Sequence, residues 1–137
     1  MGWLRNFRER MNPPKPAEVA RASVEAINSR NWQQLADLLS VDFYFLDGPG
    51  YRIDGKDRYL VAIRDLIAEA GDFHLEIDDI EIEDGVVIMR GRSHASSHSH
   101  RTAAIWRLLV VDGKIAYLHN FRANSNTRLY KFATKGP

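Results

Sequence analysis

A chain of 137 residues, with 45% hydrophobic and 27% charged side chains, is long enough to bury the core of one globular domain. Its formal net charge of +1 provides no overall attraction to nucleic acid or to an anionic membrane, and the absence of cysteine excludes disulfides and thiolate chemistry. No apolar run approaches the roughly 20 residues that cross a bilayer. Arginines also interrupt the apolar N-terminus, so we expect a cytoplasmic protein with neither a nucleic-acid nor a membrane partner.

The first 16 residues are predicted to form a short amphipathic helix and a proline-rich linker. Apolar side chains recur there at helical spacing between basic ones, at Trp3, Leu4, Phe7 and Met11. Prolines within residues 12–16 then end the helix. The helix offers too little apolar area for lasting attachment to a membrane surface. We expect it to pack against the body of the protein or against a second subunit.

Three helices and a first strand are predicted next. Apolar residues at spacings of three and four predict helices over residues 17–30, 32–39 and 56–70. Asn31 is a candidate N-cap for the second helix, and Gly71 ends the third. Between these two helices, an alternating apolar strand ends at Asp47 and is followed by a glycine-rich turn over residues 48–50.

The rest of the chain is predicted to form strands. Alternating apolar residues and short turns indicate four of them, over residues 75–82, 86–93, 98–111 and 114–122. The apolar phase shifts by one residue at residues 78–79, which indicates an irregularity in the first of these strands. Asp-Gly pairs at 84–85 and 112–113 are typical of tight hairpin turns. Helices followed by such strands predict the α+β class, with a mostly antiparallel sheet covered by helices on one face.

Several short segments carry a resemblance to a known family. They are Asn31-Trp32 to Leu39, Asp42 to Gly50, Gly55 before a helix, Trp106-Arg107, Asp112 to Ile115, and His119 to Arg122. Over about residues 17–123 the chain resembles a SnoaL-like protein of the nuclear transport factor 2-like superfamily, which leaves residues 124–137 as a C-terminal tail. The resemblance implies a curved sheet wrapped by about three helices into a cone with an internal apolar cavity, often dimeric through the open sheet face.

The resemblance also bears on individual residues. Asp47 matches the general base of the ketosteroid isomerases, which likewise ends a strand before a Pro/Gly turn. The oxyanion donors of those isomerases fall near Ser23 and Ile105, and the acid of the related cyclases falls near Arg122 or Ala123. Because electrostatic stabilisation usually supplies the largest share of such catalysis, the missing donors argue against steroid isomerisation.

Asp47 also has a purely structural interpretation. Its carboxylate could lie at the wall of an apolar pocket and transfer protons, or it could accept the backbone N–H groups of Gly48 or Gly50 and only stabilise the turn. Further candidate ligand contacts are Tyr44, Trp106, Asn120 and Arg122. If Asn120 and Arg122 point inward, Arg122 could pair with Asp47 or with an anionic ligand. Otherwise its charged end stays in water on the outer sheet face.

Three histidines lie around a predicted turn, at positions 94, 98 and 100. Neutral imidazoles at this spacing could ligate zinc or copper. No acidic residue or cysteine adjoins them in the sequence to complete such a site. We therefore expect an exposed hairpin tip and no bound metal.

Two functions of different classes follow from these observations. The first is the binding of a small hydrophobic ligand in the apolar cavity without catalysis, which the missing oxyanion donors favour. The alternative is a cofactor-independent isomerase, cyclase or dehydratase that uses Asp47 as its acid/base group. Neither function requires an organic cofactor. Because the predicted strands carry apolar residues on both faces, we also expect a homodimer that covers the face left open by the helices.

Overall fold

The structure, a computed structural model, describes residues 14–48, 50–96 and 100–122. Within these ranges the chain forms three helices and six strands. The helices are α2 (Pro16–Ser29), α3 (Trp32–Leu38) and α4 (Lys56–Glu69), and the strands are β1 (Leu39–Asp47), β2 (Tyr51–Asp54), β3 (His74–Glu83), β4 (Val86–Ala95), β5 (His100–Val111) and β6 (Lys114–Arg122). The predicted N-terminal helix and C-terminal tail lie outside the described residues.

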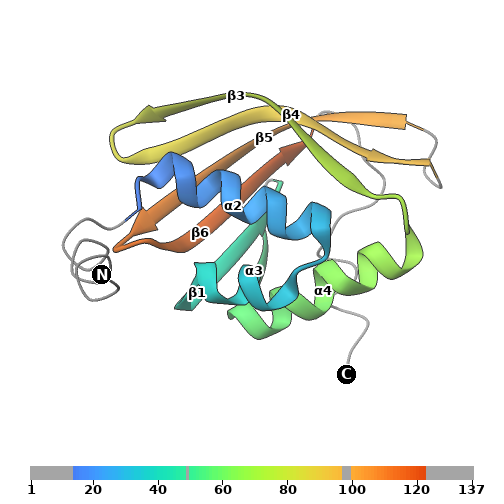
Figure 1. Cartoon of the computed structure of the whole chain (residues 1–137), viewed down its shortest axis with the longest axis horizontal. Coiled ribbons are helices and arrows are strands. Elements are labelled where there is room, and N and C mark those ends of the chain that lie inside the picture. Colours follow the sequence, from blue (N-terminus) through green and yellow to red (C-terminus); the bar gives the residue numbers. More distant parts are fainter. Residues whose placement is uncertain (1–13, 49, 97–99, 123–137) are drawn as a thin grey trace, which may run out of the picture.

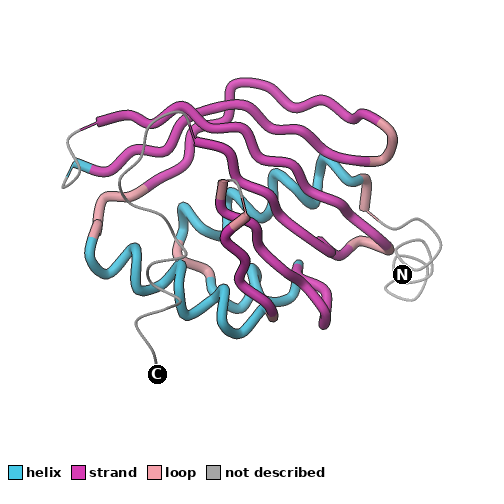
Figure 2. The backbone as a smooth tube through the Cα atoms, turned by 180° about the vertical axis from the view of Figure 1, so that it is seen from behind, coloured by secondary structure: helices cyan, strands magenta, loops and turns pink. Residues whose placement is uncertain are grey.

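The six strands form one curved sheet in the order β2-β1-β6-β5-β4-β3. Neighbouring strands are antiparallel, except that β1 and β6 are parallel. The helices lie against one face of this sheet (Figure 1), and the view from behind in Figure 2 shows the strands in front of them. The predicted α+β fold is therefore confirmed. Among the described residues, no helix has the length and apolar character needed to cross a membrane.

Local signals in the sequence set the ends of the first two helices. The Asn31 side-chain oxygen accepts a hydrogen bond from the backbone nitrogen of Gln34 at 3.1 Å, which confirms the predicted cap of α3. Arg30 ends α2 in the left-handed conformation, with a φ of 63°. Its guanidinium donates to the backbone oxygens of Gly71 and Phe73, and so ties the end of α2 to the loop between α4 and β3.

The segment between the glycine-rich turn and α4 contains a strand that was not predicted from the sequence. Residues Tyr51–Asp54 form β2, which pairs with the end of β1. Only Ile53 of this strand is buried, and it lies opposite Phe45 in the register. One buried residue in four gives too short an alternation to identify a strand from the sequence.

Strands β3 and β4 form a hairpin with the predicted irregularity. Their register shifts between Ile77 and Asp79, which confirms the change of apolar phase seen in the sequence. At the hairpin turn, Asp84 and Gly85 have φ values of 51° and 79°, as a tight turn of the I′ type requires. Gly91 lies opposite the irregularity, in register with Ile77. The bulged strand therefore comes close to a residue that has no side chain.

Candidate functional site

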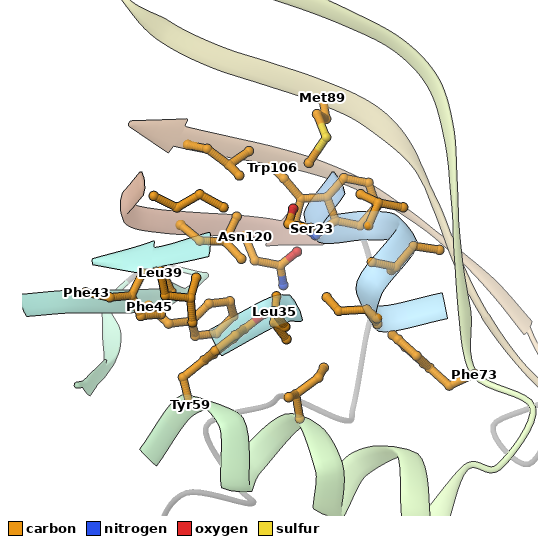
Figure 3. A pocket seen from close by; sticks show the side chains of 17 residues that line it. Ser23, Leu35, Leu39, Phe43, Phe45, Tyr59, Phe73, Met89, Trp106 and Asn120 are labelled. Carbon is orange, nitrogen blue, oxygen red and sulfur yellow. The ribbon is translucent and has the colours of Figure 1, made fainter. Parts of the chain in front are cut away.

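A pocket lies between the three helices and the inner face of the sheet (Figure 3). Its lining is almost entirely apolar and comes from both layers of the fold. The helices contribute residues such as Leu35 and Tyr59, and the strands contribute Phe45, Met89 and Trp106. These side chains face inward because the alternation of the strands and the apolar stripes of the helices direct them to the same space.

The pocket is small. The pocket has a volume of about 50 Å³, whereas pockets for drug-sized ligands measure about 300–1,000 Å³. A dry cavity of about 150 Å³ is known to hold benzene. The pocket therefore admits a molecule of only a few heavy atoms as it stands, and a ring enters only if the lining side chains move.

Two buried polar residues meet at the wall of the pocket. Asp47 and Asn120 are each 1% exposed, and the Asn120 side-chain nitrogen donates to a carboxylate oxygen of Asp47 at 3.1 Å. They lie opposite each other in the parallel register of β1 and β6. Asn120 lines the pocket, whereas Asp47 is not among the lining residues. The carboxylate thus lies behind the amide, one hydrogen bond away from the cavity.

Two hydrogen bonds hold the turn after β1 against β6. The Gly48 amide donates to the backbone oxygen of Asn120 at 2.8 Å, and the Gly48 oxygen lies 3.0 Å from a ring nitrogen of His119. The Gly48 amide is therefore directed to Asn120, not to the Asp47 carboxylate. These bonds fix the two strand ends that carry the Asp47–Asn120 pair.

The remaining candidate ligand contacts fall in different places. Trp106 lines the pocket and is 6% exposed. Tyr44 lies outside the pocket lining, with its ring stacked on Tyr117 at 5.6 Å and the Arg52 guanidinium 3.9 Å from its ring centre. The backbone of Arg122 pairs with β5 at the end of β6, and its side chain lies outside the described residues.

The helices supply pocket residues that the sequence analysis did not select. Tyr59 of α4 is 2% exposed and packs against Phe43 and Phe45, with ring centres 5.0 and 5.3 Å apart. Ser23 of α2 also lines the pocket, but its hydroxyl donates to the backbone oxygen of Ala20 at 2.7 Å. Helical spacing identified the buried faces of these helices. The spacing alone does not show which of the buried residues line a pocket.

The positions that match the oxyanion donors of the isomerases do not supply them. The Ser23 hydroxyl hydrogen is already engaged within α2. Ile105 is 40% exposed, because the inward positions of β5 are those of Ala104 and Trp106.

His94 belongs to a small polar cluster at the far end of β4. Its ring stacks on His74 at 4.4 Å, and its side-chain nitrogen lies 2.7 Å from a carboxylate oxygen of Glu76. Glu76 is distant in the sequence and was not considered as a partner. No group of three or more side chains suited to a metal ion occurs among the described residues. His98 and the side chain of His100 lie outside them.

The same cluster gives a prediction for acid. Hydrogen bonds from His94 and Arg92 hold the pKa of the Glu76 carboxyl below its ordinary value of 4.5. A carboxyl with a lowered pKa in the folded state adds stability above the ordinary value, and this stability is lost as the pH falls through the folded pKa. On acidification below about pH 4.5, the melting temperature of the Glu76→Gln variant should therefore fall by less than that of the wild type.

Thermal unfolding followed by circular dichroism between neutral pH and about pH 3 measures this difference. Glu83→Gln is the matched control, because it removes a carboxylate from the end of the same strand and leaves the Glu76 contacts in place. Parallel pH profiles for the wild type and Glu76→Gln would show that the cluster does not stabilise the fold.

Comparisons with known proteins identify a family for this chain and solved structures with a similar fold. A family described as the SnoaL-like domain matches residues 20–118. No curated protein matches the chain. Among solved structures, the chain is similar to IdmH, a proposed polyketide cyclase from Streptomyces antibioticus, with a TM-score of 0.73, 18% identity, and coverage of 81% of this chain and 94% of that one.

Two further structures show the range of names attached to this fold. A cystatin-like-fold protein of unknown function from Xanthomonas campestris has a TM-score of 0.71 and 18% identity. The match covers 88% of this chain and 98% of that one. A proposed ketosteroid isomerase from Kribbella flavida has a TM-score of 0.67 and 23% identity, and the match covers 80% of this chain and 78% of that one. At these identities the similarity shows the fold alone.

Proposed function

This chain belongs to the SnoaL-like domain family, and we propose that it binds a small apolar molecule in the pocket between its helices and its sheet. One observation supports the proposal most strongly: the helices and the sheet form a pocket whose wall is apolar except for a few polar groups. A concave apolar site with few polar groups is the usual form of a small-molecule site. The cavity volume of about 50 Å³ limits the resident ligand to a small one.

Binding without catalysis is the simpler proposal for this site. The one described carboxylate of the candidate set, Asp47, lies behind Asn120 and does not itself border the cavity. A general base must come within hydrogen-bond reach of the proton that it removes, directly or through one water. The positions of Ser23 and Ile105 also provide no oxyanion donor of the isomerase type.

Acid/base catalysis by Asp47 remains the alternative proposal. Its support is that Asp47 is buried and hydrogen-bonded to a residue of the pocket wall. Small movements of Asn120 would bring a ligand proton within reach of the carboxylate. Under this alternative, Asp47→Asn abolishes turnover while it leaves ligand binding nearly intact.

The methyl group of Met89 provides a direct test of binding. Met89 is 3% exposed and lines the pocket, and the chain has only three methionines. Xenon enters dry apolar cavities, and toluene tests whether the lining opens for a ring. In a protein labelled with carbon-13 at its methionine methyls, we expect both probes to shift the Met89 resonance in a saturable manner.

A pocket-filling variant controls for unspecific effects. Ser23→Leu places additional methyl groups in the pocket and should abolish the Met89 response, whereas Ser29→Leu makes the same change on the exposed side of α2 and should retain it. If neither xenon nor toluene moves the Met89 resonance in the wild type, the pocket does not admit a ligand and the proposal fails.

The homodimer expected from the sequence stays a prediction. The outer sheet face carries the partly exposed apolar residues Ile105 and Phe121, at 40% and 38% exposure. It also carries Arg90 and Arg92, which are paired with acidic residues of β3. The apolar side chains are the part of this face that a second copy of the chain would cover, since charged residues are depleted at the centres of protein interfaces.

A further inference from the structure

Asn120 carries an unused hydrogen-bond acceptor inside an apolar pocket. Its side-chain oxygen is fully buried and has no hydrogen-bond partner among the described residues. More than nine-tenths of buried polar groups in native proteins are paired, and a buried group left unpaired costs free energy. The residue lines the cavity, and Figure 3 shows its amide among the lining side chains. A bound molecule is therefore in a position to satisfy this oxygen.

Asp47 fixes which end of the amide faces the pocket. The Asn120 side-chain nitrogen donates to a carboxylate oxygen of Asp47 at 3.1 Å, so the NH₂ end of the amide faces Asp47. The orientation of an asparagine amide is assigned from such a network. Since the amide is planar and its two ends diverge, pairing of the nitrogen with Asp47 leaves the oxygen for another partner. The buried carboxylate thus acts as a positioning group for an acceptor on the pocket wall.

The nearby serine does not supply the missing donor. The single hydroxyl hydrogen of Ser23 is engaged by the backbone oxygen of Ala20 at 2.7 Å. Much of the remaining lining is made of aliphatic and aromatic carbon, such as that of Leu35, Phe45 and Met89. Among the described residues, none donates to the Asn120 side-chain oxygen, so a molecule that occupies the pocket is in a position to supply the donor.

We infer that the ligand of this pocket is a small, neutral, largely apolar molecule that carries one hydroxyl or N–H group and donates it to the side-chain oxygen of Asn120. This inference rests on the proposed ligand-binding function and adds the polarity of the ligand to it. Ketones, ethers and carboxylates offer only acceptors to this oxygen. A cation would be poorly accommodated, because burial of an ionised group in apolar surroundings costs far more than burial of a hydroxyl.

Isosteric probes separate a donor from mere apolar bulk. Phenol, aniline and toluene have nearly the same shape, and only phenol and aniline carry a donor. We expect phenol and aniline to bind about tenfold more tightly than toluene in titrations that follow the Met89 methyl, because only they satisfy the buried acceptor. Anisole has an oxygen without a donor and should bind no more tightly than toluene.

Asn120→Leu tests the assignment to a single residue. It keeps the approximate volume and removes the acceptor, and Asp47→Leu in the same chain removes the carboxylate behind it, so the preference of this double variant should reverse, with toluene bound more tightly than phenol. If this variant does not fold, the ranking of the four probes on the wild-type protein decides alone.

The outcomes distinguish the inference from the function on which it rests. Toluene bound as tightly as phenol by the wild type, or an unchanged preference in a folded double variant with Asn120→Leu and Asp47→Leu, overturns the inference and leaves the apolar pocket in place. Absence of binding by every probe, xenon included, overturns the proposed function itself. Tighter binding of phenol and aniline, lost in the double variant, supports both the inference and the proposed function.

Discussion

Leu35→Ala should lower the free energy of unfolding by about 3 kcal/mol and at the same time enlarge the pocket, so that an aromatic ring binds more tightly than it does to the wild type. Leu35 is 1% exposed, belongs to α3 and lines the cavity. Its truncation removes buried apolar contacts and joins the vacated space to the existing 50 Å³. A ligand that fills this enlarged space at 100 times its dissociation constant should restore about 2.7 kcal/mol.

Chemical denaturation with and without saturating phenol measures both effects. Val61→Ala is the control, because Val61 is 58% exposed on α4 and its truncation should change stability by less than about 0.5 kcal/mol. A Leu35→Ala protein that is destabilised but gains no stability from phenol would show that the new space is not continuous with a ligand-accessible pocket.

Gly91→Ala should be the most disruptive small substitution on the sheet, with a loss of about 3 kcal/mol. A β-carbon at this position would lie 1.9 Å from the backbone oxygen of Glu76 and 3.0 Å from the α-carbon of Ile77. Both are backbone atoms, so no side chain can turn aside to relieve the clash. The close approach results from the irregularity in β3, where the register with β4 shifts between Ile77 and Asp79.

Gly71→Ala provides the comparison, because a β-carbon there meets nothing within 4 Å. Thermal or urea unfolding of the two variants beside the wild type measures the difference. Equal stability of Gly91→Ala and wild type would mean that β3 and β4 do not approach each other as closely at Gly91 as the structure shows.

Signals carried by neighbouring residues predicted much of the fold correctly. The cap at Asn31 and the Asp84-Gly85 turn depend on contacts within a few residues. The irregularity at residues 78–79 showed in the sequence because it shifts the apolar alternation itself. In contrast, β2 contains one buried residue, and pairing with β1, not its own pattern, makes it a strand.

The candidate site was harder to predict because its contacts are long-range. Asp47 and Asn120 were both selected, but their hydrogen bond spans 73 positions and depends on the parallel register of β1 and β6. Tyr44 and Phe45 alternate on one strand, and only the docking of the helices decides that Phe45 faces the pocket. Likewise, Glu76 meets His94 only because β3 pairs with β4.

The most direct test of the binding proposal is a crystal structure of the protein soaked in phenol. We expect density for one ring inside the pocket, beside Trp106 and Met89, with its hydroxyl within hydrogen-bond distance of the Asn120 side-chain oxygen. Phenol found only on the outer sheet face, with the internal cavity empty or filled by water, would contradict the account.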